Sequence, residues 1–195
     1  MEKTPQNTFE QRKEELRQLI EVKKRSAIYV DQYEELFEQL NQYEDLIRER
    51  GIESLIPTEK NDYEKKKEKL ATISIDIATI PELRFILEEL GKSEEEIREN
   101  LAHENAHANV AHSLGANHEK YIVYFLKEGN IYQTRVTFPD NLSQEEVDYI
   151  SSRAIQAPEE YGNAGGMSDD DKEQLENINQ KKGSEDLPKD WDFIK

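Results

Sequence analysis

The sequence predicts an α+β fold that is mainly helical, with a small β-hairpin sheet and a long helical arm at the N-terminus. Residues 8–50 contain neither Gly nor Pro and are dense in Glu, Gln, Lys and Arg, which is typical of exposed helix. Residues 93–115 combine a helix start, an apolar stripe and a glycine stop. Further along, two alternating segments flank Gly129-Asn130, which is the pattern of a hairpin.

The N-terminal arm carries apolar residues at near-heptad spacing, from Phe9 to Ile47. This spacing predicts one long helix or a two-helix hairpin that packs on the rest of the protein. The alternative is a dimerising coiled coil, in which case the chain forms a homodimer through these helices. Gly51 ends the pattern, and we take residues 1–58 as a helical arm or coiled-coil-like hairpin.

The remaining elements follow from local patterns along residues 59–182, which we expect to form one domain. Residues 183–195 are expected to be a flexible tail. In chain order the sequence predicts a charged helix capped by Thr58 or Asn61, a strand within 71–80, a helix from Pro81 to Gly91, a helix over 94–114, a hairpin over 121–138, a helix from Ser143 to Ala157, a Gly-rich loop over 158–167 and a helix over about 169–181.

Composition restricts the partners and the chemistry. The formal net charge is −17, which disfavours a nucleic acid or an anionic membrane surface as partner. There is no cysteine, so a metal site would need histidine and carboxylate ligands. The sequence has no apolar run long enough to span a membrane and no signal-peptide pattern, and we expect a cytoplasmic protein.

His103, Glu104 and His107 form the string HENAH, a match to the H-E-x-x-H pattern. Residues four apart on a helix lie about 40° apart around its axis, so both imidazoles project from one face and can bind one zinc ion. Glu104 can lie beside the metal without binding it and take a proton from a zinc-bound water. The alternative is a solvated helix face that carries two histidines by chance.

The surroundings of the motif favour a helix. All four histidines lie within residues 103–118. Leu114-Gly115 is a typical C-terminal stop. The start and the apolar stripe of this helix are given by the capping-box pair Ser93 and Glu96 and by Ile97, Leu101, Ala108 and Ala111.

A catalytic zinc site needs a third protein ligand. His112 is five residues after His107, about 140° further round the helix, and should point away. His118 follows Gly115, where the chain can turn back, so it is one candidate. The other candidate is a carboxylate from a downstream helix.

The stretch HENAHANVAHSLG resembles the active-site helix of the peptidase domain of FtsH-type membrane AAA proteases. In that family a β segment, a helix and a Gly-rich stretch lead to an aspartate at the start of another helix, and this aspartate is the third zinc ligand. The order of elements over residues 93–180 is similar. The resemblance implies a zincin-like metallopeptidase domain over 59–182, without the ATPase activity of the family.

The family's aspartate can be matched to Asp169, Asp170 or Asp171. We choose Asp171, because Leu175 and Ile178 then follow at +4 and +7 and fix that face of the helix against the core. The alternative is that all three are first-turn acids that the helix dipole favours.

The sequence therefore predicts a zinc-dependent metallopeptidase. Its metal ligands are His103, His107 and Asp171, its general base is Glu104, and its substrate is a peptide or protein. Two alternatives stay open: a catalytically silent helical interaction protein on the same scaffold, and a hydrolase of non-peptide substrates at the same metal site.

Overall fold

The computed structural model describes residues 5–28, 33–127, 129–160 and 165–182. They form a mainly helical α+β structure with a small antiparallel sheet, whose strand order is β1-β2-β3. This confirms the predicted fold class at that level. The elements are α1 Pro5–Ala27, α2 Tyr33–Arg50, the 3-10 turn η1 Ile52–Ser54, α3 Pro57–Ala71, β1 Ser74–Ile77, α4 Ile80–Glu89, α5 Glu94–Ser113, β2 Asn117–Leu126, β3 Gly129–Thr137, α6 Gln144–Glu160 and α7 Asp169–Lys182.

The chain divides into two compact units. Unit 1 comprises Met1–Gly91 and Tyr121–Gln133, and unit 2 comprises Lys92–Lys120 and Thr134–Lys195. Unit 1 thus holds the predicted arm together with the residues that follow it up to Gly91. The predicted domain over residues 59–182 includes residues of both units and stays a prediction. The predicted flexible tail, residues 183–195, lies outside the described residues.

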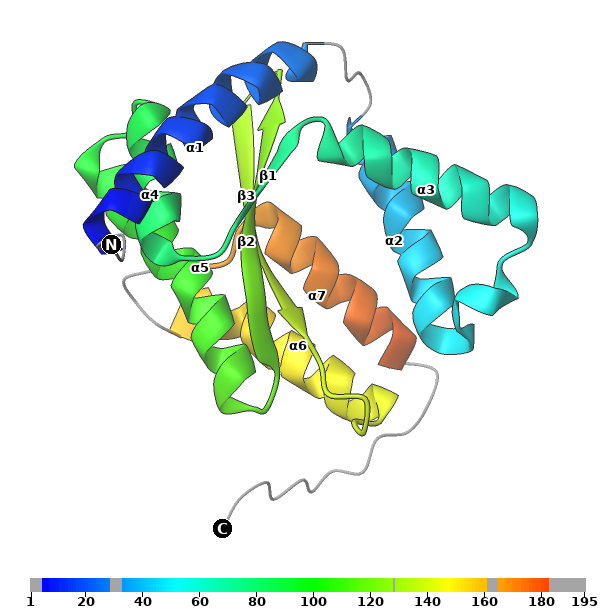
Figure 1. Cartoon of the computed structure of the whole chain (residues 1–195). Coiled ribbons are helices and arrows are strands. Elements are labelled where there is room, and N and C mark those ends of the chain that lie inside the picture. Colours follow the sequence, from blue (N-terminus) through cyan, green and yellow to red (C-terminus); the bar gives the residue numbers. More distant parts are fainter. Residues whose placement is uncertain (1–4, 29–32, 128, 161–164, 183–195) are drawn as a thin grey trace. The chain divides into compact units, whose positions relative to one another are not determined.

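In unit 1 the predicted N-terminal arm consists of two helices, of which α1 lies against α4 and β1 (Figure 1). Leu16 and Ile20 of α1 are buried. Arg12 Nε donates to Glu82 Oε1 over 2.9 Å and ties α1 to the start of α4. The helix α2 packs on α3 through the buried side chains Leu36, Leu40 and Tyr63. Both helices therefore pack within their own unit, and the homodimer stays a prediction.

Unit 1 also contains the predicted strand and part of the hairpin. The strand β1 pairs antiparallel with β2, with Ser74 opposite Tyr124 and Ile77 opposite Tyr121. One expectation was wrong: the charged helix starts at Pro57 and is capped by neither Thr58 nor Asn61. Proline fits the first turn of a helix, because its missing N–H has no helical acceptor there.

In unit 2 the motif-bearing helix α5 begins at the predicted cap. The Ser93 N–H donates to Glu96 Oε2 over 2.8 Å, and the Glu96 N–H donates to Ser93 Oγ over 3.3 Å. The helix α5 packs on α6, and α6 packs on α7. Small side chains fill the α5–α6 contact, which lets the two backbones approach closely. Four buried alanines lie in this contact, together with the larger side chain of Ile150: they are Ala106, Ala111, Ala154 and Ala157.

The helix α6 is longer than predicted. It was expected to end at Ala157, before a Gly-rich loop that starts at Pro158. Instead it continues through Pro158 to Glu160, and residues 161–164 lie outside the described part of the chain. The expectation failed because a proline in the last turn of a helix removes one hydrogen bond without ending the helix.

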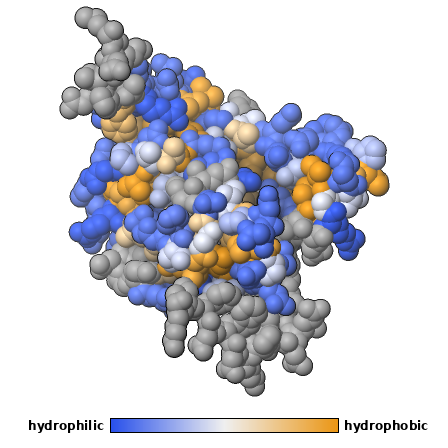
Figure 2. Space-filling model, turned by 60° about the horizontal axis from the view of Figure 1, so that its bottom comes forward, coloured by the Kyte–Doolittle hydropathy of each residue, from blue (hydrophilic) through white to orange (hydrophobic). Residues whose placement is uncertain are grey.

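Figure 2 shows a face on which hydrophobic residues form separate groups among hydrophilic ones. No helix in the described ranges is long and apolar enough to cross a membrane. Among the described residues, the large hydrophobic side chains that are exposed include Val22, Ile28, Ile52, Ile56 and Tyr149.

Candidate metal centre

The helix α5 directs His103 and His107 to one side. Their Nε2 atoms lie 3.1 Å apart, and their side chains are 17% and 12% exposed. This arrangement follows from their i, i+4 spacing on a regular helix. The pair is therefore largely withdrawn from solvent, unlike two histidines on a solvated face.

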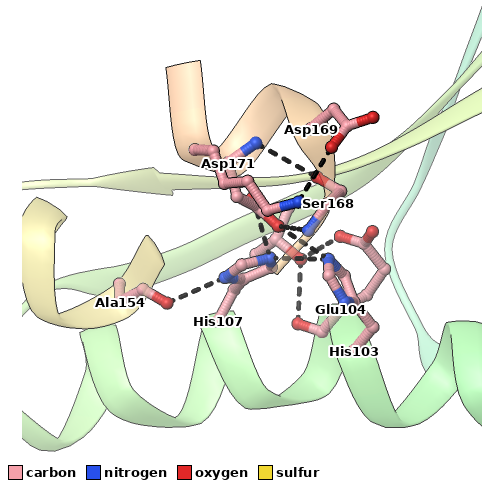
Figure 3. A network of polar contacts seen from close by, with 9 residues as sticks. His103, Glu104, His107, Ala154, Ser168, Asp169 and Asp171 are labelled. Atoms are coloured by element: carbon pink, nitrogen blue, oxygen red, sulfur yellow. Dashed lines mark hydrogen bonds and ion pairs between the residues drawn. The ribbon is translucent and has the colours of Figure 1, made fainter. Parts of the chain in front are cut away.

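Asp171, in the first turn of α7, meets the two histidines (Figure 3). Its Oδ2 lies 3.1 Å from His103 Nε2, and its Oδ1 lies 3.4 Å from His107 Nε2. One ligand atom from each of the three residues can be chosen so that all lie within 4.8 Å of one another. His103, His107 and Asp171 thus form a group that can hold a metal ion, and all three belong to unit 2.

The spacing of these atoms can be compared with that of real metal ligands. Bonds of about 2.1 Å place neighbouring ligand atoms about 3.4 Å apart in a tetrahedral site and about 3.0 Å apart in an octahedral one. The two histidine Nε2 atoms lie 3.1 Å apart, and each lies 3.1 or 3.4 Å from a different oxygen of Asp171. With one ligand atom taken from each residue, all three atoms lie within 4.8 Å of one another, so a small shift of the carboxylate would bring one oxygen to ligand spacing from both nitrogens. The donor set of two imidazoles and one carboxylate suits zinc and other first-row transition metals. The residues therefore fit such an ion, and the distances alone do not select which one.

A backbone carbonyl of α6 orients His107. His107 Nδ1 lies 2.8 Å from the carbonyl oxygen of Ala154 (Figure 3). Because a carbonyl oxygen can only accept, Nδ1 must carry the hydrogen. In the neutral ring the lone pair then lies on Nε2, which points toward His103 and Asp171. A hydrogen bond of this kind fixes the tautomer and the orientation of the ring.

Asp171 is also part of the cap of α7. Its Oδ2 accepts the Ser168 N–H over 2.8 Å, and its own N–H donates to Ser168 Oγ over 3.1 Å. Burial alone would raise the pKa of the Asp171 carboxyl, but contacts with His103, His107 and Ser168 together lower this pKa below its ordinary value. The carboxyl is therefore held ionised, which is the form that binds a cation.

Glu104 lies next to the metal-binding group and is 3% exposed. Thr134 Oγ1, on β3, lies 2.8 Å from Glu104 Oε2 and 2.9 Å from the Glu104 carbonyl oxygen. Burial raises the pKa of the Glu104 carboxyl, although His107, Thr134 and His103 oppose the effect. A hydroxyl has one proton to donate, so when Thr134 directs it to the carbonyl, only the protonated carboxyl can complete the second hydrogen bond.

Asp171 is buried beside the two histidines, whereas two other residues weighed as the third ligand are exposed. Asp169 is exposed, and its Oδ1 accepts from Lys172 Nζ over 2.8 Å. His112 is exposed, as its position on the helix predicts. The side chains of Asp170 and His118 lie outside the described residues.

Two groups at this site were not expected from the sequence, namely the hydroxyl of Thr134 and the carbonyl of Ala154. Thr134 lies on the predicted hairpin, but nothing in a single sequence relates a strand position to a helix 30 residues earlier. One feature of the sequence could have pointed to the Ala154 carbonyl. Pro158, four residues later, removes the amide that would otherwise bond to it.

Comparison with known proteins gives no further guide. No family model, no curated protein and no solved structure matches this chain. What the site can do is therefore argued from its own residues.

Proposed function

We propose that this protein is a zinc-dependent metallopeptidase. The observation that supports the proposal best is the convergence of His103, His107 and Asp171 beside the buried Glu104, all within one compact unit. Three protein ligands leave a coordination position free, which is the pattern of a catalytic zinc site rather than a structural one. On this proposal unit 2 carries a zincin-like centre, and the FtsH-like order of elements accounts for the entry of Asp171 from α7.

The choice of zinc rests on Glu104 more than on the distances. Two histidines and one carboxylate also occur as ligands of non-haem iron. In the H-E-x-x-H arrangement, however, a glutamate follows the first histidine and has no place among the ligands. Here Glu104 Oε2 lies 2.8 Å from Thr134 Oγ1. A carboxylate that lies next to a metal ion without binding it is suited to proton transfer in hydrolysis.

Residues of unit 2 can be assigned to the steps of peptide hydrolysis. A bound zinc polarises a scissile carbonyl and lowers the pKa of water. Glu104 takes the proton of the attacking water and later gives it to the leaving amine. Burial raises the pKa of the Glu104 carboxyl, which makes its carboxylate a stronger proton acceptor. Ala154 and Ser168 hold His107 and Asp171 in place.

The substrate we propose is a peptide in extended conformation. In the described part of the chain β3 is the last strand in the order β1-β2-β3, so one of its edges has no partner strand there. Thr134 on this strand contacts Glu104. A peptide that adds to this edge would pass next to the proposed general base, with backbone hydrogen bonds supplying affinity.

Metal content and hydrolysis of an unstructured protein test the proposal together. The purified protein should bind one zinc per chain by elemental analysis, and His103→Ala with His107→Ala should abolish binding, because one remaining ligand does not hold zinc. His112→Ala on the same helix is the matched control. Full zinc occupancy in the double variant would exclude this site.

Replacement of Glu104 separates an enzyme from a silent scaffold. Glu104→Gln should keep zinc and lower the rate of casein cleavage by about 10²–10⁴, the usual effect of losing a general base. Glu99→Gln, at an exposed position of the same helix, should have no effect. If the wild type binds zinc but cleaves neither casein nor short peptides, the interaction protein or the non-peptide hydrolase is favoured instead.

A further inference from the structure

A proline lies inside α6 at the position that controls one particular carbonyl. In an α-helix the N–H of residue i donates to the carbonyl of residue i−4. Pro158 lies within α6 and has no N–H, so the carbonyl of Ala154 lacks its helical donor. It is this carbonyl that lies 2.8 Å from His107 Nδ1 (Figure 3).

We propose that Pro158 is a positioning residue for the metal centre. By withholding an amide from Ala154, it keeps that carbonyl available for the His107 Nδ1–H, which leaves Nε2 as the metal-binding atom. The metal part of this inference rests on the proposed function. Its structural part, the control of the His107 tautomer, does not need a bound metal.

The packing around Pro158 suits this role. Its side chain is under 2% exposed, and the neighbouring Ala157 is fully buried against Ala106 of α5. The small side chains let the two helices approach closely enough for a ring on α5 to reach a backbone carbonyl on α6. A proline ring also crowds the carbonyl four residues earlier and tilts it away from the helix axis.

Two prolines that lie at the starts of helices differ from Pro158 in their effect on hydrogen bonding. Pro57 and Pro81 lie in the first turns of α3 and α4. In a first turn the N–H has no helical acceptor, so a proline there leaves no carbonyl free. Pro158 by contrast lies near the C-terminal end of α6, where each amide normally pairs, and its position costs α6 a hydrogen bond.

Pro158→Ala tests the inference, because alanine restores the amide. In the metal-free variant the restored amide should compete for the Ala154 carbonyl, and His107 should lose the Nδ1–H tautomer, read by long-range proton–nitrogen NMR of its ring. Zinc affinity, measured by competition with a chelating dye, should fall about 10–100-fold, the usual effect of losing an outer partner of a histidine ligand. The melting temperature of the metal-free protein should stay the same or rise, since alanine suits a helix better.

Two further variants complete the test. Pro81→Ala, in the first turn of α4, is the matched control and should change neither the His107 tautomer nor zinc affinity. If Pro158→Ala melts lower because the proline ring leaves a void, Pro158→Val fills the space while it also restores the amide, and the tautomer is read there.

The possible results distinguish a failure of this inference from a failure of the proposed function. If His107 keeps the Nδ1–H tautomer in the Pro158 variants, or lacks it in the wild type, the inference is overturned. A changed tautomer with unchanged zinc affinity also overturns it, since positioning for the metal would then have no effect. If the wild type binds no zinc but the His107 tautomer changes as expected in the Pro158 variants, the proposed function fails. The inference that Pro158 controls the His107 tautomer is then still supported.

Discussion

Replacing Thr134 with valine would test how the proposed general base is held. Valine has nearly the shape of threonine but no hydroxyl, so the variant removes the 2.8 Å contact to Glu104 Oε2 and the 2.9 Å contact to the Glu104 carbonyl oxygen. Glu104 is 3% exposed, so bulk water has little access to replace the lost partner. The carboxyl group is left without this hydrogen bond inside the protein.

The size of the effect follows from the energy of such contacts. A hydrogen bond to a charged group contributes about 1.5–3 kcal/mol, and a buried group left without a partner costs about 1–3 kcal/mol. If the contact orients Glu104 in the transition state, kcat should fall about 10- to 150-fold, since about 1.4 kcal/mol is a factor of ten in rate. Zinc content should not change, because the Thr134 hydroxyl contacts Glu104, which is not one of the three proposed ligands.

The assay is kcat and KM on a fluorogenic peptide, with zinc content measured on the same samples. Thr134→Ser keeps the hydroxyl and should recover most of the rate, which loss of packing alone would not predict. Thr137→Val, at an exposed position of the same strand, is the matched control. A Thr134→Val protein with wild-type kcat and full zinc content would refute the reasoning.

Two further predictions concern other parts of unit 2. Asp171→Asn should weaken zinc binding by more than the roughly 10–100-fold expected for an outer partner, while Asp169→Asn, in the same turn, should leave it unchanged; equal effects in a dye-competition assay would remove Asp171 from the ligand set. Contacts with the Ser93 N–H, with Lys92 and with the Ser93 hydroxyl lower the pKa of Glu96 to about 2. This pKa lies below its unfolded value, so the stabilisation is present above about pH 4.5 and is lost as the pH falls toward 2. Ser93→Ala should raise the Glu96 pKa in an NMR titration, and an unchanged pKa would contradict this account of the cap.

Local patterns predicted most of the secondary structure, because the signals lie within a few residues of each other. Ser93 and Glu96 mark the start of α5, and the predicted reciprocal hydrogen bonds are present. The alternation near residue 75 predicted β1. The failures have the same local origin. One helix was expected to begin after Pro57 and another to end before Pro158, whereas Pro57 begins its helix and Pro158 lies inside its own.

The tertiary relations of the site could be predicted only in part. The i, i+4 spacing fixes His103 and His107 relative to each other, since both lie on one rigid helix. The approach of Asp171 came from a family resemblance and from the apolar positions that follow it, and the structure places it 3.1 Å from His103. Whether the three bind zinc stays a prediction. Thr134 could not be found, because its contact with Glu104 depends on how a strand packs across a helix.

The burial of the motif weighs against a chance match. On a solvated helix face, both imidazoles and the glutamate would be exposed, and no partners would be needed. Here Glu104 is 3% exposed, and the side chains of His103 and His107 are 17% and 12% exposed. Burying ionisable groups is unfavourable unless each has a partner.

Each of these groups does have one, and the partners come from three separate elements of unit 2. Thr134 of β3 contacts Glu104, Ala154 of α6 accepts from His107, and Asp171 of α7 contacts both rings. A hydrogen on His103 Nε2 can donate to Asp171 Oδ2, which lies 3.1 Å away. When both neutral rings instead carry the hydrogen on Nδ1, the two Nε2 lone pairs, 3.1 Å apart, face a shared space and repel each other. A proton or a cation between them relieves that repulsion, and the adjacent ionised carboxylate favours a positive charge there. Two imidazoles and an ionised carboxylate that converge in this way form a donor set for a metal ion, which is the occupant we expect.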